Sequence, residues 1–215
     1  MNIDIYADIL CPWCYIGKRR LSAALALLDR RDEVCVTWRS FELSPDQSRT
    51  PGPSAAEEIL EWRGKQEGAA RIERIRTLGA AEGLELNLHL ARPVNTFDAH
   101  RLVHLAAANG LADAMMERLL HAYHTEGLSV ADLAVLLRLG TQVGLAGDTV
   151  RATLEADEFT AETRRDEQGA SARGVTGVPT LIIDGGQPLP GIQSPEDLAR
   201  LFAARLADGR GAEHD

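Results

Sequence analysis

The chain has 215 residues, of which 45% are hydrophobic and 26% are charged, and its formal net charge is −9. A chain of this length can bury one well-packed core, or one core with a sizeable inserted segment. The acidic balance argues against nucleic acid or an anionic membrane as the main partner. The first residues, MNIDIYADIL, lack the basic and long apolar segments of a signal peptide, and no apolar run is long enough to cross a bilayer. We therefore expect a cytoplasmic protein.

The first fifty residues are predicted to form a strand, a helix and a second strand. Residues 2–8 (NIDIYAD) alternate apolar and polar side chains, which is typical of a strand. Apolar residues at helical spacing then predict a helix over residues 11–30. Residues 33–42 (EVCVTWRSFE) are rich in β-branched and aromatic side chains and predict the second strand. Prolines and a glycine in residues 45–53 end this unit.

The pattern is helical from residue 54 to residue 174. Candidate helices cover residues 54–67, 69–82, 96–109, 112–126, 130–143, 148–155 and 158–174. Glycines mark several of their ends. Ser129 and Asp148 are the expected N-caps of two of these helices, because their side chains can accept a hydrogen bond from a free N–H of the first turn.

The strand signal returns after the helical block. Residues 180–184 predict a strand, a glycine pair predicts a turn, and residues 187–189 predict a short second strand. A last amphipathic helix with a capped start is predicted over residues 194–206. Residues 208–215 are small, polar and charged, which is typical of a frayed tail.

The order of these elements predicts an α/β fold whose sheet is divided in the sequence. The two halves of the sheet are separated by the helical block and must come together around it. We therefore divide the chain into an N-terminal sheet half (1–53), an all-helical insertion (54–174), a C-terminal sheet half (175–207) and a flexible tail (208–215). No internal repeat is visible.

Two cysteines three positions apart stand at the first strand-to-helix turn. Cys11 and Cys14 enclose Pro12 and Trp13 in the segment DILCPWCYIGKRRL. Zinc, a pair of structural thiols and a reversible disulfide can each use this spacing. Structural zinc takes four protein ligands, and the chain has no second C-x-x-C. We therefore favour redox chemistry and assign no metal.

The position of the cysteines suggests a division of roles. A helix N-terminus carries free N–H groups and partial positive charge, which favour a thiolate at Cys11, so we expect Cys11 to be the accessible, attacking sulfur. Cys14 lies one turn further along and is expected to be the more buried, resolving thiol. Pro12 suits the first helical turn because its missing N–H costs nothing there. Trp13 is expected to be partly exposed and to shape the substrate surface.

Two further side chains in the N-terminal sheet half could bear on the chemistry. Asp8 precedes Cys11 by three residues, and its carboxylate could relay a proton during exchange or merely hold the start of the helix by hydrogen bonds. Cys35 is flanked by Val34 and Val36 on the second predicted strand, and we interpret it as a buried, inert thiol.

At this point the sequence resembles a known family. The cysteine motif at the first helix, the helical insertion and the late segment before a β-β-α end resemble the DsbA-type branch of the thioredoxin superfamily, and within it the FrnE-like subgroup. The stretches that carry the resemblance are DILCPWCYIGKRRL, WRSFELSP, NTFDAHRLVHLA, HAYHTEG and GVTGVPTLIIDG. The extra C-terminal cysteine pair of some relatives is absent, because no cysteine follows Cys35.

The resemblance implies a thioredoxin-like fold and several site residues. Pro179 would be the cis-proline that faces the cysteines, whereas the sequence alone would favour an ordinary trans turn proline. The backbone of Val178 would then pair with an extended substrate segment. Asn95 and His100 of the NTFDAHR segment would lie in the substrate groove, although Thr96 or Asn95 could instead be just the cap of the helix. We expect the helical block to pack as one lid on the cysteines, with this segment nearest the sulfurs.

The function that the resemblance implies is thiol–disulfide exchange with protein substrates, by a DsbA-like disulfide oxidoreductase or isomerase. It needs no cofactor beyond the redox-active cysteine pair, with glutathione a candidate co-substrate and no nucleic acid or membrane partner. One alternative is a glutathione-dependent enzyme similar to kappa-class transferases and 2-hydroxychromene-2-carboxylate isomerases, which usually have a serine in place of the first cysteine. Another is a non-catalytic holdase. The direction of exchange, the substrate, and the choice between monomer and homodimer stay open.

Overall fold

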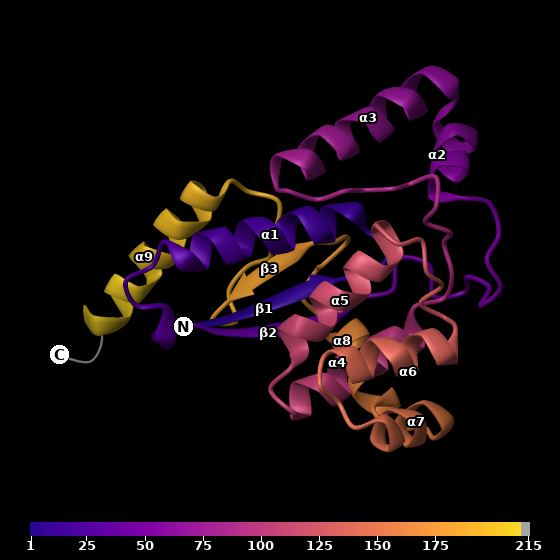
Figure 1. Ribbon diagram of the computed structural model, residues 1–215. Helices are drawn as coiled ribbons and strands as arrows, with labels where there is room; N and C mark the ends of the chain where they lie inside the picture. Colours follow the sequence, from indigo (N-terminus) through magenta and orange to yellow (C-terminus); the bar gives the residue numbers. More distant parts are fainter. Residues whose placement is uncertain (212–215) are drawn as a thin grey trace.

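The computed structural model describes residues 1–211, and its centre is a four-stranded sheet (Figure 1). The strands are β1 (Asn2–Ala7), β2 (Cys35–Ser40), β3 (Thr180–Ile183) and β4 (Leu189–Pro190). Their order is β2-β1-β3-β4, with β2 parallel to β1 and β3 antiparallel to it. The contact between β1 and β3 therefore joins the two ends of the chain into one sheet, and the predicted thioredoxin-like α/β fold is confirmed.

The predicted helices are present in the described residues, with shifted ends. They are α1 (Pro12–Ala26), α2 (Ala55–Arg63), α3 (Lys65–Ala81), α4 (Phe97–Ala108), α5 (Ala112–His124), α6 (Leu133–Gln142), α7 (Gly147–Glu155), α8 (Thr160–Ala172) and α9 (Pro195–Gly211). Helix α9 continues five residues beyond the predicted end at 206, so the first half of the predicted tail is helical. The remaining tail residues, 212–215, lie outside the described part of the chain.

Both predicted N-caps in the helical block are wrong. Helix α6 begins later than predicted because the side chain of Asp132, rather than that of Ser129, accepts the N–H groups of Ala134 and Val135. Helix α7 begins one residue earlier than predicted, so Asp148 lies within its first turn. There its negative charge still opposes the positive end of the helix.

The alternation of side chains along β1 places helices on both faces of the sheet. Ile3, Ile5 and other alternate residues join the main core, which also includes apolar residues of α1 and α9. Tyr6 points to the opposite face, where it packs with Ala170 of α8 and with Ile182 of β3. Helices α1 and α9 pack against each other, and α8 packs on β2 (Figure 1).

The helical insertion forms two groups rather than the single lid that we expected. Helices α2 and α3 pack against each other, and α3 also contacts α1. Helix α4 is the centre of the second group, where it contacts α5, α6, α7 and α8, and α5 contacts both α1 and β2 (Figure 1). The long non-helical segment 82–96 connects the groups and allows them to lie apart. The start of α1 is therefore flanked by α3 and by α5.

None of the helices within residues 1–211 is both long and apolar enough to cross a membrane.

Candidate active site

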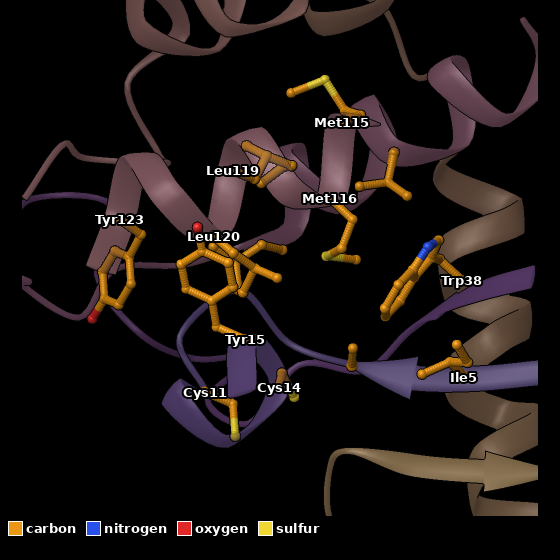
Figure 2. Packing of buried hydrophobic residues seen from close by; sticks show 14 of the residues in the cluster. Ile5, Cys11, Cys14, Tyr15, Trp38, Met115, Met116, Leu119, Leu120 and Tyr123 are labelled. Atoms are coloured by element: carbon orange, nitrogen blue, oxygen red, sulfur yellow. The ribbon is translucent and has the colours of Figure 1, made fainter. Parts of the chain in front are cut away.

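The two cysteines occupy the first turn of α1, directly after β1. The N–H of Cys11 donates to the carbonyl of Asp8 at 3.2 Å, and Cys11 is the N-cap residue of the helix. Pro12 occupies the first helical position, as predicted, and the first turn contains no acidic residue. The positive end of the helix is thus not neutralised by a carboxylate of its own, and Cys11 is the side chain at that end. Figure 2 shows both cysteines at the start of α1, with Tyr15 rising from the helix toward α5.

Both sulfurs are more covered than the sequence suggested. Cys11 is 4% exposed and Cys14 is 1% exposed, so their order is as predicted but Cys11 is not openly accessible. The thiol of Cys11 donates to the carbonyl of Val178 at 3.6 Å. Burial raises the pKa of the Cys14 thiol, and the contact with Cys11 and the charge of Asp8 raise it further, whereas the backbone of Asp8 acts in the opposite direction. Cys14 therefore holds its proton more firmly than a free thiol.

The Val178–Pro179 peptide bond is cis, which is the geometry that the resemblance implies. The loop that contains Pro179 lies very close to α1, and two glycines make room for it. A Cβ atom added to Gly17 would lie 2.9 Å from the carbonyl oxygen of Gly191 and 3.1 Å from Cγ of Pro179. A Cβ atom added to Gly191 would likewise meet Pro179 at 2.9 Å. The close approach of helix and loop thus depends on residues without side chains.

An apolar pocket of about 310 Å³ opens beside the cysteines, between the two groups of insertion helices. It is lined by Leu10, Pro12, Ala55, Glu58, Ile59, Trp62, Arg71, Ile75, Leu88, Pro93, Tyr123 and His124. The lining residues come from the start of α1, from α2 and α3, from the segment before α4 and from the end of α5. A concave apolar site with few polar groups is the usual form of a ligand pocket.

Trp13 is half-buried, in agreement with the expectation, and lies near helix α3. The guanidinium carbons of Arg71 and Arg74 are 6.0 and 5.9 Å from the centre of its ring. Both distances are within the range of cation–π attraction. Because Arg71 also lines the pocket, Trp13 and the pocket share one wall.

Two of the residues that line this pocket each carry a buried polar atom without a hydrogen-bond partner. The hydroxyl of Tyr123 and Nε2 of His124 are both buried and unpaired. Burial lowers the pKa of His124 to about 4, although backbone groups of Ile9 and Cys11 and the charge of Asp8 raise it, so the ring is neutral at pH 7. The sequence reasoning missed these residues, although they belong to the HAYHTEG segment on which the resemblance partly rests.

Asp8 lies at the end of β1 and is completely buried. Its carboxylate accepts the N–H of Leu43 at 2.7 Å and that of Leu10 at 3.4 Å. Nε2 of His100 lies 3.5 Å from the same carboxylate. The hydrogen bond to Leu10 matches the structural interpretation of Asp8, and its charge near Cys14 is compatible with the proton relay.

The NTFDAHR segment does not form the exposed groove wall that we expected. His100 is 1% exposed and stands behind Asp8, because the face of α4 that carries it is turned into the core. Asn95 binds the carbonyl of Pro45 at 2.8 Å and Glu42 at 3.2 Å. Its side chain also accepts the N–H of Phe97, the first residue of α4, at 3.1 Å, although the N-cap position itself belongs to Thr96. His100 thus lies behind Asp8 and is covered, whereas Asn95 is half-buried, and its contact with a substrate stays a prediction.

Two residues after the cysteines, which the sequence reasoning did not single out, tie α1 to α5. The hydroxyl of Tyr15 donates to Glu117 at 2.8 Å, and burial and this carboxylate raise its pKa to about 12. Nζ of Lys18 lies 2.9 Å from Asp113 and 3.3 Å from Glu117. The available signal was helical spacing: Asp113 and Glu117 are four residues apart on α5, and Tyr15 and Lys18 are three apart on α1, so each pair lies on one face of its helix.

Cys35 is exposed, not buried as predicted. It is the first residue of the edge strand β2. Because side chains alternate along a strand, the apolar neighbours Val34 and Val36 mark the opposite face, and Cys35 itself points away from the core. Within residues 1–211, no group of three or more His, Cys, Asp or Glu side chains is placed to hold a metal ion.

Comparison with known proteins identifies the family. The model of the DSBA-like thioredoxin domain matches residues 2–203. The probable DsbA oxidoreductase SCO1869 from Streptomyces coelicolor is 32% identical, with a TM-score of 0.89 over 96% of this chain and 90% of that one. The uncharacterized protein YwbO of Bacillus subtilis (strain 168) is 26% identical over 194 residues, which are 89% of this chain and 90% of YwbO.

A third similar protein is the cytosolic disulfide reductase DsbM of Pseudomonas aeruginosa, which has also been solved with GSH. It is 22% identical, with a TM-score of 0.68 over 96% of this chain and 99% of that one, a likeness that concerns the fold. Because the family model spans nearly the whole chain and the cysteine pair stands at the start of α1, the protein belongs to the DSBA-like thioredoxin domain family of thiol–disulfide oxidoreductases.

Proposed function

We propose that the protein exchanges disulfides with protein substrates through Cys11 and Cys14. One observation carries this proposal: Cys11 caps α1 as the less buried sulfur, beside an apolar pocket, while Cys14 lies directly behind it. Such a pocket suits the apolar side chains of a partly unfolded protein. Pro12 lines the pocket and Trp13 shares its wall, so these two residues are proposed to contact the substrate.

The proposed reaction has two steps. The thiolate of Cys11 attacks a substrate disulfide, so a bond forms between Cys11 and one substrate sulfur while the other leaves as a thiolate. Cys14 then gives its proton to Asp8 and attacks the sulfur of Cys11, which releases the second substrate thiolate and leaves a Cys11–Cys14 disulfide. The reverse sequence oxidises a dithiol. The direction in the cell follows from the reduction potential of the pair relative to its compartment. The cytosolic DsbM relative supports a cytoplasmic setting.

The first experiment traps the intermediate. All variants carry Cys35→Ser, because the exposed third thiol would form disulfides of its own. In this background, Cys14→Ser should accumulate mixed disulfides with substrate proteins, visible on non-reducing gels and located at Cys11 by mass mapping. Cys11→Ser should abolish reduction of insulin disulfides. Wild-type insulin reduction by the Cys11→Ser variant would overturn the proposal.

A glutathione-dependent transferase or isomerase is the second candidate. It is favoured by the charged side chains of Glu58 and Arg71 in the lining of the pocket, which a small polar ligand could contact. The structure of DsbM with GSH is compatible with glutathione as a co-substrate here. Chemistry of this kind does not need Cys14, so the Cys14→Ser variant would keep its turnover with glutathione. Loss of turnover in that variant favours disulfide exchange.

A further inference from the structure

Cys14 must lose its proton at a place that solvent does not reach. The residue is 1% exposed, and Asp8, whose charge acts on it, is 0% exposed. Burial raises the pKa of Cys14, so the thiol does not ionise readily by itself. A proton passed from Cys14 to Asp8 is still inside the protein. Repeated turnover therefore requires a further group between Asp8 and the surface.

His100 occupies the position next to Asp8. Its Nε2 atom lies 3.5 Å from Oδ1 of Asp8, and the ring is 1% exposed. This nitrogen makes no hydrogen bond. A buried polar atom without a partner costs free energy, so its retention beside a carboxylate calls for an explanation. Imidazole can accept a proton at one nitrogen and release one at the other, which suits it to transfer between two carboxylates.

A pair of carboxyl groups continues the sequence from His100 toward the surface. Glu42 directly precedes Leu43, whose N–H donates to the carboxylate of Asp8 at 2.7 Å, so Glu42 lies close to the pair formed by Asp8 and His100. The charge of His100 acts on Glu42, whose side chain is 1% exposed. Glu42 contacts Glu167 of α8, whose side chain is 23% exposed, and Arg164 lies 2.8 Å from both carboxyl groups. Oε1 of Glu167 is otherwise unpaired, which leaves room for a proton shared between the two carboxyl groups.

The pKa of Glu42 suits a group that accepts and releases protons near neutral pH. Burial and the contact with Glu167 raise its pKa to about 7, although His100 and Arg164 lower it. A group with such a pKa is present in both protonation states at pH 7 and can both accept and release protons.

We propose that His100, Glu42 and Glu167 form a path along which the proton of Cys14 leaves Asp8 and reaches solvent. This inference rests on the proposed disulfide exchange and adds three residues to it. In the resolving step the electron pair of Cys14 forms the new bond to Cys11, and the substrate sulfur leaves with the pair of the broken bond. The Cys14 proton passes to Asp8, then through His100 to Glu42 and Glu167, and the departing thiolate takes its proton from solvent.

The other ionisable groups around His100 are paired with other residues or are poor proton carriers near pH 7. On its own helix, Asp98 pairs with Arg49 and Arg101, and His104 pairs with Ser40 and Asp166. On α5, Tyr123 and His124 also respond to the charge of Asp8, but burial raises the pKa of Tyr123 and lowers that of His124 to about 4, so neither exchanges a proton readily at pH 7. On α1, Cys14 is the donor itself. Asp8 and Glu42 are thus the groups through which His100 would exchange protons, and Arg164 is the charge that holds the outer carboxyl pair.

The test separates the two steps of exchange. A reduced Cys35→Ser protein is mixed in a stopped-flow instrument with a peptide disulfide that fluoresces on cleavage at either sulfur. The first phase reports attack by Cys11, and the second reports resolution by Cys14. His100→Gln and Glu42→Gln should leave the first phase unchanged and slow the second at least about tenfold, since proton transfer by a positioned group typically contributes about 10²–10⁴-fold. In the parent protein the second phase should accelerate as pH rises through about 7, the value for Glu42, and this dependence should disappear in Glu42→Gln.

Matched variants distinguish a relay from a structural role. His104→Gln removes the other buried-side histidine of α4, which pairs with Asp166 rather than Asp8, and Glu82→Gln removes a carboxylate that pairs with Arg20. Both should leave the ratio of the two phases unchanged. If His100→Gln does not fold, Glu42→Gln alone decides. An unchanged second phase in Glu42→Gln, or equal slowing in His104→Gln, overturns the relay while disulfide exchange stands. A parent protein without a first phase overturns both.

Discussion

At the scale of single residues, burial shifts the pKa of three ionisable groups in the direction that favours their neutral forms. It raises the pKa of Cys14, raises that of Glu42 to about 7 and lowers that of His124 to about 4. The common cause is that a charged group loses its hydration when it is buried, so acids hold their protons and bases release theirs. Each of these three groups therefore favours its neutral form more strongly than it would in water.

His124 should make the folded state sensitive to acid. Its folded pKa of about 4 lies below the unfolded value of 6.5, so between these values the unfolded chain binds more protons. The free energy of unfolding should therefore fall as pH is lowered through this window, by roughly 3 kcal/mol in total. Glu42 acts in the opposite direction, because its raised pKa makes the folded state less stable as pH rises from about 4.5 to about 7.

Because the two contributions oppose each other, the measurement must be a difference between variants. Urea unfolding of the parent protein and of His124→Gln should be followed from pH 4 to pH 7. The parent should lose stability relative to the variant as the pH falls. Parallel stability curves would show that the ring is not buried in its neutral form.

At the scale of elements, the site is built where the start of α1 meets the Pro179 loop, and the contact between them is unusually close. Gly17 faces this loop from α1, and Gly191 faces it from the segment after β4. A glycine within a helix normally costs about 1 kcal/mol relative to alanine. Here the missing side chain allows the loop to reach the helix one turn after Cys14, so the cost is offset by the geometry of the site.

Gly17→Ala should therefore destabilise the protein despite its better helix propensity. The new Cβ atom would lie 2.9 Å from the backbone oxygen of Gly191, which cannot move without a shift of the main chain. Such overpacking typically lowers the free energy of unfolding by about 1–3 kcal/mol. The loop should move away from Cys14, and disulfide exchange should slow. Gly147→Ala is the control, because its Cβ atom would meet Cγ2 of Thr141 at 3.4 Å, an ordinary contact. Thermal unfolding and insulin reduction measure both effects. A Gly17→Ala protein more stable than the parent would contradict the packing described here.

At the scale of the whole molecule, distant parts of the chain meet at the cysteines. The pocket takes its walls from α1, α2, α3 and α5, and the cysteines face a loop near the C-terminus. Because the insertion is divided into two groups, the pocket lies between them rather than under one lid. Substrate selection should then depend on α2 and α3 as much as on the residues beside the sulfurs.

Ile59→Glu should slow disulfide exchange with apolar peptide substrates but not with small disulfides. Ile59 lines the pocket from α2, and a carboxylate there would oppose the entry of apolar side chains because its burial is costly. Exchange with peptides that carry apolar residues beside the cysteine should slow, whereas exchange with a small aliphatic disulfide should not. Leu27→Glu changes a residue that is 60% exposed at the far end of α1 and should affect neither. Equal effects on both substrate types would place the binding surface elsewhere.

Sequence patterns predicted the fold well because its elements depend on local signals. The period of apolar residues and the glycines at helix ends predicted the helices and strands, with ends shifted by a few residues. The cysteine motif located the reacting atoms. The patterns failed where the answer depends on contacts between distant segments. The face of β2 that the helices leave open decides the exposure of Cys35, and the packing of α4 decides which way His100 points. The division of the insertion is likewise a property of tertiary contacts, which no local period records.

The exposed Cys35 affects how a measured reduction potential of this protein is interpreted. Asn2 is its partner in the sheet, so Cys35 lies at the opposite end of β1 from Cys11, roughly 20 Å away along a six-residue strand. A disulfide requires α-carbons within about 7 Å, and Cys35 therefore cannot bond to either active-site sulfur of its own chain. A titration of free thiols counts three per chain, whereas the two-electron couple uses two. Cys35 can form a protein disulfide only with a second chain, and the extent of that reaction varies with protein concentration. In a dithiol buffer, which forms no stable mixed disulfide with a single thiol, a reduction potential that shifts on dilution would thus report Cys35, and one that does not shift would belong to the Cys11–Cys14 pair.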